Sequence, residues 1–327
     1  MTEMQLGERL IVNCLPLTEA ERQSFLEASG DVRQIFLADP SRRGTMLWQA
    51  DVPHDIRGHA TAVIGNIEVD TLPDFINLEW LQTWSAGVDR YLNSGAFPPD
   101  AVLTSASGAY GQTVAEHMFA MLWALMKNLP GYRDQQRAHE WNDLGRAATL
   151  DGATVVILGT GDLGSHFAHL VKGCGAHTLG VRRDPSKSAD GIDAMYGFDA
   201  LDVLLTKADV VACFLPSSAD THHLIDLHRL ELLRDGAILL NGGRGDVLDE
   251  RSLPSQLHRL RGVGLDVTEA EPLPDDSPLW NEPNCLITPH VAGGYHLEAT
   301  ERRIIDIARE NVRRYAAGEP LRNVMRH

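Results

Sequence analysis

Three residues in the second half of this sequence of 327 residues have side chains suited to acting on a small organic acid: Arg244, Glu271 and His290. A guanidinium makes a two-pronged contact with a carboxylate and polarises a nearby carbonyl. An imidazole gives or takes a proton near neutral pH, and a carboxylate at its other nitrogen orients it and favours its protonated form. Together these groups can bind a 2-keto acid and protonate its carbonyl oxygen. From the residues alone, Glu269 and Glu271 can equally be two ordinary acids of a proline-rich loop.

A glycine-rich segment can supply the hydride that such a reduction needs, through a bound cofactor. Gly159-Thr160-Gly161-Asp162-Leu163-Gly164 joins the apolar run 155–158 to a helical stretch, 165–172. In this setting Gly159 permits a tight turn, Gly161 lets the backbone approach a diphosphate, and Gly164 lets the helix pack closely on the strand. The segment therefore predicts a dinucleotide-binding turn.

The residues after the next predicted strand indicate which cofactor binds. Enzymes that use NAD usually carry an acid about 20 positions on, which holds the ribose 2′-hydroxyl. Here Arg182 stands 18 residues after Gly164, and Arg183 and Asp184 follow it. Because arginine offers a rigid cationic fork that suits a phosphate, we predict NADP(H) as the preferred cofactor and NAD(H) as a possible one. The alternative is that both arginines are solvated and Asp184 holds the ribose.

Short apolar runs alternate with amphipathic stretches, which is typical of α/β proteins with parallel sheets. The first series of runs comprises 10–15, 35–38, 61–64, 78–84 and 101–103. The second comprises 154–158, 177–181, 209–215, 237–241, 263–266 and 286–288, which suggests the six strands of a doubly wound dinucleotide-binding fold. Motifs with Arg244, Glu271 and His290 follow the fourth, fifth and sixth of these runs. Because ligands bind at the carboxyl ends of such strands, we expect the three side chains to converge.

Two helices are expected to connect separate domains, since a chain of this length exceeds one hydrophobic core. Residues 114–126 are apolar nearly all round, which predicts a helix buried on most sides. A last amphipathic helix, 298–315, is followed by Gly318 and Pro320 as stop signals. We expect it to return and pack on the first series. We predict an α/β fold of two Rossmann-like domains with doubly wound parallel sheets. A dinucleotide-binding domain, 109–292, is inserted into a flavodoxin-like substrate domain, 1–108 and 293–327.

Composition narrows the class of partner. The net charge of −16, from 29 basic and 45 acidic residues, opposes binding to nucleic acid or to an anionic membrane. The cysteines at 14, 174, 213 and 285 form no metal or redox motif, so we expect buried free thiols in a reducing compartment and no metal site. No apolar run reaches the roughly 20 residues that span a bilayer, and residues 1–17 lack a signal-peptide core. We therefore expect a cytoplasmic protein.

The sequence resembles the D-isomer-specific 2-hydroxyacid dehydrogenase family, which includes glyoxylate/hydroxypyruvate reductases, D-lactate dehydrogenases and phosphoglycerate dehydrogenases. The matching segments are 159–164, 241–246, 265–274 and 288–293, with weaker matches at 85–89, 114–117 and 317–321. The resemblance spans nearly the whole chain. It implies hydride transfer between NAD(P)H and a small 2-keto or D-2-hydroxy acid, with Arg244, Glu271 and His290 as catalytic residues. Glu271 is preferred to Glu269 because it directly precedes Pro272.

The resemblance also implies binding residues. To the glycine turn and the two arginines it adds four cofactor-binding residues: Leu215, Pro216, Gly243 and Asp266. The first two would lie along the adenosine, and Asp266 on the nicotinamide side. Beside Arg244 and His290, the implied substrate-binding residues are Gly65, Asn66, Ser85, Ala86 and Gly87. The family is usually dimeric, so we expect a homodimer with residues 128–144 as an arm that embraces the partner.

Several positions depart from the family's pattern, and they bear on the substrate. Besides Arg182, these are Ser105, Ser107, Thr268 and Tyr295. Because they lie near the expected cleft, the substrate of a relative should not be transferred. Candidates for lining the substrate pocket are Trp48, Trp84, Tyr110, Trp280 and Tyr295. No second basic cluster stands out near 64–89, which favours a substrate without a phosphate.

Two alternatives on the same fold stay open, and a third is disfavoured. Formate dehydrogenases pair the histidine with an amide, so Glu271 argues against that activity. Phosphite oxidation would use the same three groups. A nucleotide-sensing binding protein, like the family's corepressors, would retain the fold and much of the triad. A panel of keto acids discriminates this binding protein from an enzyme.

Overall fold

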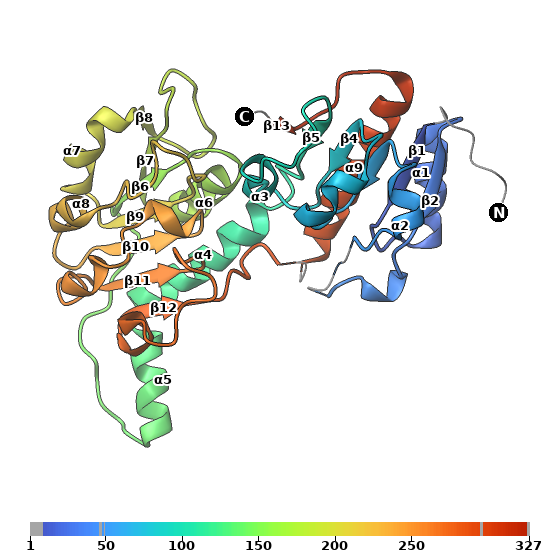
Figure 1. Cartoon of the computed structure of the whole chain (residues 1–327). Helices are drawn as coiled ribbons and strands as arrows, with labels where there is room; N and C mark the ends of the chain where they lie inside the picture. The colour runs from blue at the N-terminus through green and yellow to red at the C-terminus, as the bar shows by residue number, and fades with distance from the viewer. Residues whose placement is uncertain (1–8, 46–47, 49, 295–296, 326–327) are drawn as a thin grey trace. The chain divides into compact units, whose positions relative to one another are not determined.

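The computed structural model describes residues 9–45, 48, 50–294 and 297–325, and the chain divides into two compact units (Figure 1). Unit 1 comprises Met1–Tyr110 and Tyr295–His327, and unit 2 comprises Gly111–Gly294. Each unit is built on one largely parallel sheet with helices. The predicted α/β class with two parallel sheets is confirmed.

Unit 1 contains a 6-stranded sheet in the order β13-β5-β4-β3-β1-β2. Its strands are β1 (Leu10–Asn13), β2 (Arg33–Phe36), β3 (Ala62–Ile64), β4 (Trp80–Gln82), β5 (Val102–Thr104) and β13 (Val324–Met325). Strands β1 to β5 pair in parallel, in the order 2-1-3-4-5 of flavodoxin-like folds. The short β13 pairs antiparallel with β5 and was not among the predicted strands, because two residues make no apolar run.

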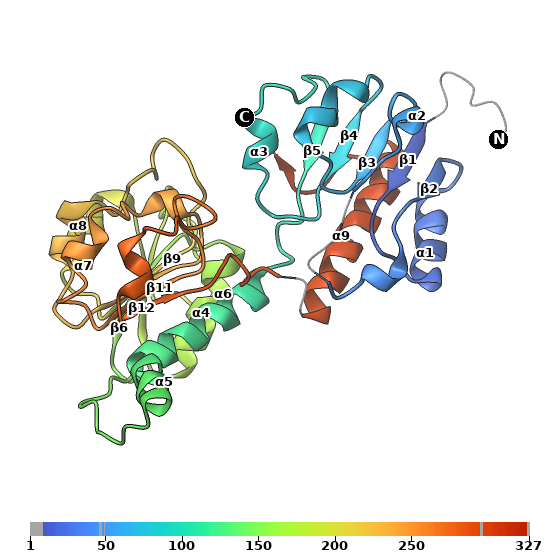
Figure 2. The same ribbon diagram turned by 60° about the horizontal axis from the view of Figure 1, so that its bottom comes forward.

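The helices of unit 1 are α1 (Glu19–Ser29), α2 (His54–Arg57), α3 (Asp89–Leu92) and α9 (Glu298–Ala317), with 3-10 turns at Pro40–Arg42 and Val69–Asp74. A capping box of Thr18 and Glu21 starts α1. Gly318, with φ of 69°, ends α9 in the left-handed conformation that glycine favours. The buried side of α9 includes Ile304 and Val312, and the helix packs on α1 along the sheet (Figure 2).

Unit 2 contains a 7-stranded sheet, in the order β12-β11-β10-β9-β6-β7-β8, in which every pair is parallel. Its strands are β6 (Thr154–Leu158), β7 (His177–Val181), β8 (Ala194–Tyr196), β9 (Val210–Cys213), β10 (Ile238–Asn241), β11 (Gly262–Leu265) and β12 (Cys285–Ile287). The predicted number of strands was wrong. β8 was missed because its three half-buried residues carry no strong apolar signal. The three motifs therefore follow the fifth, sixth and seventh strands of the unit.

The helices of unit 2 are α4 (Gly111–Met126), α5 (Leu129–Ala138), α6 (Asp162–Gly173), α7 (Leu201–Leu205) and α8 (Leu227–Leu232). Short 3-10 turns lie at Phe198–Ala200, Gly245–Val247, Leu253–Ser255 and Pro278–Asn281. α4 packs on α6, β10 and β11 and buries Met118 and Met121 there. Phe119 and Trp123 on the same helix are only half-buried, so α4 is less enclosed than its composition suggests.

None of the helices in the described part of the chain has the length and apolar character needed to cross a bilayer. Within the same residues, no group of three or more His, Cys, Asp or Glu side chains is arranged to hold a metal ion. All four cysteines are free thiols, and burial raises the pKa of Cys213 to about 12. Cys174 and Cys285 are half-buried, whereas buried thiols were expected.

Candidate active site

The glycine-rich segment forms the turn between β6 and α6. Gly159 has φ of +87°, and a Cβ there would lie 2.8 Å from the carbonyl oxygen of Phe214. A Cβ at Gly164 would lie 2.0 Å from the carbonyl oxygen of Gly159, so α6 begins in direct contact with the turn. Gly161 is the N-cap of α6, and nothing lies within 4 Å of where its Cβ would stand. The turn leaves open space beside the first N–H groups of α6, which fits a dinucleotide's diphosphate.

The segments after β9 and β10 pack against the same turn. A Cβ at Gly243 would lie 2.6 Å from the carbonyl oxygen of Leu215, and a Cβ at Gly159 would lie 3.2 Å from Cδ2 of that leucine. The carbonyl oxygen of Pro216 accepts a hydrogen bond from Thr221 Oγ1 at 2.7 Å. Gly159, Leu215 and Gly243 are therefore brought together at the carboxyl ends of β6, β9 and β10.

Asp162 and Leu163 occupy the first turn of α6. Oδ2 of Asp162 accepts a hydrogen bond from the backbone N–H of Gly111 at 2.8 Å. This contact links the first turn of α6 to the first residue of α4, a structural role that the sequence did not predict for Asp162.

Two arginines and an engaged carboxylate stand at the end of β7. Oδ1 of Asp184 accepts hydrogen bonds from the Ser186 hydroxyl at 2.6 Å and from its backbone N–H at 3.2 Å. These bonds hold the pKa of Asp184 below its ordinary value. Arg182 donates to the carbonyl oxygen of Lys187 at 3.4 Å, and the exposed Arg183 lies 3.3 Å from Asp220. The carboxylate of Asp184, which could hold a ribose, thus points towards Ser186 in its own loop.

Arg244 lies between β10 and the 3-10 turn Gly245–Val247. The Asn241 side chain braces this segment, because its Nδ2 donates to the carbonyl oxygen of Arg244 at 3.0 Å and its Oδ1 accepts from the N–H of Gly243 at 3.2 Å. A Cβ at Gly245 would lie 2.0 Å from the carbonyl group of Thr268. The loop that carries Arg244 therefore packs directly on the loop that carries Glu271.

His290 and Glu271 form a direct pair. Nδ1 of His290 lies 2.8 Å from Oε2 of Glu271, and Oε1 of Glu271 accepts from the N–H of Thr268 at 3.3 Å. The two side chains are 48% and 40% exposed, so the imidazole remains accessible. Oε1 of Glu269 instead lies 3.0 Å from Nε2 of His223. The structure thus pairs Glu271, and not Glu269, with His290.

Asp266 holds the segment that carries His290. Its buried carboxylate accepts hydrogen bonds from Thr288 Oγ1 at 2.6 Å and from the N–H groups of Val291 and Ala292 at 3.0 Å each. Its carbonyl oxygen accepts from the N–H of His290 at 2.8 Å. His117 Nε2 lies 3.0 Å from Thr288 Oγ1 and extends this network. The sequence assigned no roles to His117 and Thr288, and their only signal was their place inside the matching segments.

A cavity of about 630 Å³ adjoins the pair. Its lining residues are Asp266, Thr268, Glu271, Pro272, Leu273, Asp275, Trp280, Ile287, Thr288, Pro289 and His290. Trp280, one of the aromatic residues predicted to line the substrate pocket, thus lines the same cavity as His290. Tyr295 lies outside the described residues.

In unit 1, the loops after β3 and β4 interlock. Gly65 sits so tightly that a Cβ would lie 2.7 Å from the Cβ of Ala50. Oδ1 of Asn66 accepts a hydrogen bond from the N–H of Trp84 at 3.0 Å, and the Ser85 hydroxyl donates to the carbonyl oxygen of Gly87 at 2.8 Å. Gly65–Asn66 and the half-buried residues 85–87 are thereby brought together within this unit.

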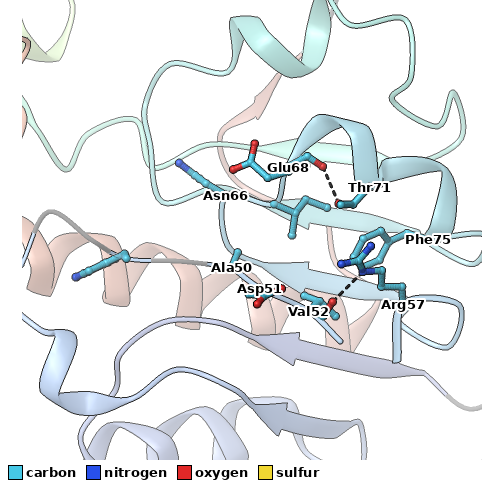
Figure 3. Close-up of a pocket in the computed structure, with 10 residues that line it drawn as sticks. Ala50, Asp51, Val52, Arg57, Asn66, Glu68, Thr71 and Phe75 are labelled. Atoms are coloured by element: carbon cyan, nitrogen blue, oxygen red, sulfur yellow. Dashed lines mark hydrogen bonds between the residues drawn. The ribbon is translucent and has the colours of Figure 1, made fainter. Parts of the chain in front are cut away.

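A cavity of about 240 Å³ lies beside Asn66 (Figure 3). Its lining residues are Trp48, Ala50, Asp51, Val52, Arg57, Asn66, Ile67, Glu68, Thr71 and Phe75. Arg57 is engaged by the carbonyl oxygen of Val52 and by Asp74, each at 2.8 Å. Trp48 meets Trp84 edge-on with ring centroids 5.6 Å apart, and Trp48, Trp84 and Tyr110 are all buried.

Unit 2 has a doubly wound parallel sheet, and the glycine-rich turn after its first strand, β6, leads into the N-terminus of α6. These two features place the chain among the dinucleotide-binding α/β proteins. Comparison with known proteins then gives the family. Residues 119–292 match the family model described as D-isomer specific 2-hydroxyacid dehydrogenase, NAD binding domain. The chain belongs to this family of NAD(P)-dependent oxidoreductases, and the resemblance seen in the sequence is confirmed.

Individual relatives agree with this assignment. The chain is 31% identical over 253 residues to glyoxylate/hydroxypyruvate reductase B of Enterobacter sp., which covers 74% of this chain and 78% of the relative. A D-isomer specific 2-hydroxyacid dehydrogenase family protein from Aeromonas salmonicida has a similar structure, with a TM-score of 0.81, 33% identity and coverage of 98% and 99% of the two chains. A D-isomer specific 2-hydroxyacid dehydrogenase from Xanthobacter autotrophicus, solved with NADPH and MES, gives a TM-score of 0.77 at 26% identity, covering 98% of each chain.

Proposed function

We propose that this chain reduces a small 2-keto acid to its D-2-hydroxy acid with NADPH, and catalyses the reverse oxidation with NADP⁺. The observation that carries the proposal is the contact of 2.8 Å between His290 Nδ1 and Glu271 Oε2. Arg244, Glu271 and His290 follow β10, β11 and β12, which are consecutive strands of the sheet. An accessible imidazole oriented by a carboxylate is the arrangement that a general acid and base requires.

Each of the three side chains has one task in this reaction. When bound, the reduced cofactor supplies the hydride that goes to the carbonyl carbon. Arg244 binds the substrate carboxylate and polarises the carbonyl. Because Glu271 takes Nδ1 of His290, Nε2 is left to give a proton to the carbonyl oxygen, and in the oxidation it takes that proton back. The carboxylate of Glu271 stabilises the imidazolium form that does this.

For unit 1 we propose that Gly65, Asn66, Ser85, Ala86 and Gly87 contact the substrate. Arg57, the cation that lines the adjoining cavity, is already paired with Asp74, while Asp51 and Glu68 add negative charge there. This charge favours a keto acid without a phosphate or a second carboxylate. Since a relative with 31% identity is named glyoxylate/hydroxypyruvate reductase, glyoxylate and hydroxypyruvate are the substrates to test first.

The proposed preference for NADP(H) rests on the end of β7. Asp184, which would repel a 2′-phosphate if it faced the ribose, is bonded to Ser186 instead. Arg182 and Arg183 place two cationic forks in the same segment. A relative solved with NADPH supports this choice. We further propose that the chain forms a homodimer through residues 128–144.

One assay tests the activity and the cofactor. The purified protein is mixed with glyoxylate, hydroxypyruvate, pyruvate or phenylpyruvate and with NADPH or NADH, and the loss of near-ultraviolet absorbance is followed. We expect turnover of at least one keto acid and a higher kcat/KM for NADPH. A preference for NADH of about tenfold, roughly 1.4 kcal/mol, would reject the role of the arginines. No turnover of any keto acid would favour a nucleotide-sensing binding protein, and oxidation of phosphite alone would favour a phosphite dehydrogenase.

A further inference from the structure

Glu250 contacts the loop that presents Glu271, although its sequence context resembles an ordinary charged surface. It follows the segment of Arg244, three residues beyond the 3-10 turn Gly245–Val247. Its Oε1 accepts a hydrogen bond from the backbone N–H of Glu269 at 2.6 Å. Glu269 lies two positions before Glu271. A half-buried carboxylate is thus fixed to the backbone of the loop that orients the imidazole.

The same loop is held at further points. Thr268 packs on Gly245 so closely that a Cβ at this glycine would lie 2.0 Å from the threonine's carbonyl group. The Thr268 hydroxyl donates to the carbonyl oxygen of Ala270 at 2.8 Å, and its N–H donates to Oε1 of Glu271 at 3.3 Å. Together with the Glu250 contact, these interactions fix the loop whose Glu271 carboxylate is bonded to His290.

The charge of Glu250 changes in the range where an imidazole works. Burial raises its pKa to about 7, the negative charges of Glu269 and Glu271 add to this effect, and the hydrogen bond from Glu269 opposes it. On β12, burial with the charges of Glu282 and Glu250 raises the pKa of Cys285 to about 12, so this thiol stays neutral at neutral pH. Further titratable groups on the packed segments are His223, whose Nε2 lies 3.0 Å from Oε1 of Glu269, and Arg251, which lies 3.7 Å from Asp249.

Resting on the proposed function, we propose that Glu250 is a positioning residue for the reaction. Its carboxylate anchors the N–H of Glu269 and so keeps Glu271 on His290, and its negative charge helps His290 to retain the proton that is donated. When Glu250 is ionised, its charge acts on the imidazole in the same direction as that of Glu271. When it is protonated, the anchoring hydrogen bond remains but this contribution is lost.

Two substitutions separate the anchor from the charge. Glu250→Gln keeps an oxygen that accepts from Glu269 N–H but removes the charge. The pH at which kcat/KM for keto-acid reduction falls should move down by roughly half a unit, while the rate at low pH stays near that of the wild type. Glu250→Asp keeps the charge but is shorter by one methylene. It should lower kcat about tenfold with little movement of the pH profile, because the loop loses its anchor.

Glu231→Gln, on the exposed surface of α8, is the matched control for the change in net charge. It should leave kcat and the pH profile of kcat/KM unaltered. A merely structural role for Glu250 would show as a lower melting temperature with an unmoved pH profile in Glu250→Gln. That outcome would overturn the proposal. If Glu250→Gln is too unstable to assay, a wild-type kcat in Glu250→Asp would equally reject the anchoring role.

A second readout does not depend on turnover. In the protein with ¹⁵N-labelled histidine and no added cofactor, the imidazole signal that is missing from His290→Gln is followed against pH. Its titration midpoint should lie lower in Glu250→Gln than in the wild type or in Glu231→Gln. Equal midpoints would contradict the role of the charge. If the wild type reduces no keto acid, the proposed function fails, but this titration still decides whether Glu250 acts on His290.

Discussion

His290 adopts a left-handed backbone conformation, with φ of 52°, which residues with a Cβ rarely occupy. Such a conformation costs about 1–3 kcal/mol and persists where surrounding contacts fix it. Here the contacts come from Asp266, whose carbonyl oxygen accepts a hydrogen bond from the N–H of His290 and whose carboxylate accepts from the N–H groups of Val291 and Ala292. At the scale of the residue, the structure therefore fixes the direction of the imidazole with a buried carboxylate that is not itself the proton donor.

Replacement of His290 by alanine tests the proton-transfer role. We expect His290→Ala to lower kcat for keto-acid reduction by about 10² or more, because the general acid is lost while the binding residues remain. The matched control is His258→Ala, an exposed histidine of the same unit, which should keep its activity. A rate near that of the wild type in His290→Ala would remove this residue from the mechanism.

Replacement of Arg244 by lysine tests the two-pronged contact. Lysine keeps the charge but loses the planar fork, so Arg244→Lys should raise KM for the keto acid and lower kcat, by about tenfold or more in kcat/KM. Steady-state kinetics of Arg251→Lys, an exposed arginine in the same unit, gives the baseline. Unchanged kinetic constants in Arg244→Lys would show that the guanidinium does not bind the substrate.

At the scale of the element, the turn between β6 and α6 uses its glycines for two different reasons. Gly164 leaves no room for a Cβ, since the backbone of Gly159 occupies that place. Gly161 has open space around the same position. The first glycine therefore serves the packing of the helix on the strand, and we propose that the second serves the approach of the dinucleotide to the backbone.

This difference predicts opposite behaviour of two alanine variants. Gly164→Ala should destabilise the protein by about 2 kcal/mol, because the start of α6 must shift, and its melting temperature should fall by several degrees. Gly161→Ala should keep the melting temperature but weaken NADPH binding at least tenfold, because the methyl group enters the space for the diphosphate. Thermal unfolding and calorimetric titration measure both. Wild-type NADPH affinity in a well-folded Gly161→Ala would show that no diphosphate lies at this turn.

At the scale of the whole molecule, a series of exposed apolar side chains lies on α5 and the segment after it. Leu129, Tyr132 and Leu144 are exposed, and the Trp141 side chain is 100% exposed. Exposed aromatic and aliphatic side chains gathered on one projecting segment are typical of a protein interface. They support the proposed homodimer arm.

Light scattering after gel filtration tests the assembly. We expect the wild type to have the mass of a dimer and the double variant Leu129→Asp, Trp141→Asp to have that of a monomer, because the charges cannot be buried at an interface without partners. Leu227→Asp, at an exposed leucine of α8, should remain dimeric. A monomeric wild type would contradict the proposal, and a dimeric double variant would place the interface elsewhere.

Much of the fold could be predicted because buried parallel strands appear in the sequence as apolar runs. β6 and β7 have the predicted limits, whereas β8 and β13 were missed because short edge strands bury too little to leave a pattern. The candidate site was predicted in part for a similar reason. Motif residues stand at strand ends. Glu250 carries no local signal, and His117 and Asn241 lie inside matching segments without a predicted role.

The sequence by itself determined the α/β class, the dinucleotide turn and the family, because these depend on local spacing and on residue types at strand ends. Only the tertiary structure decided that Glu271 rather than Glu269 contacts His290, that Asp184 is turned towards Ser186, and that Glu250 accepts a hydrogen bond from the N–H of Glu269. The physical reason is that a hydrogen bond depends on the direction of a side chain, and that direction is set by packing between segments far apart in the chain.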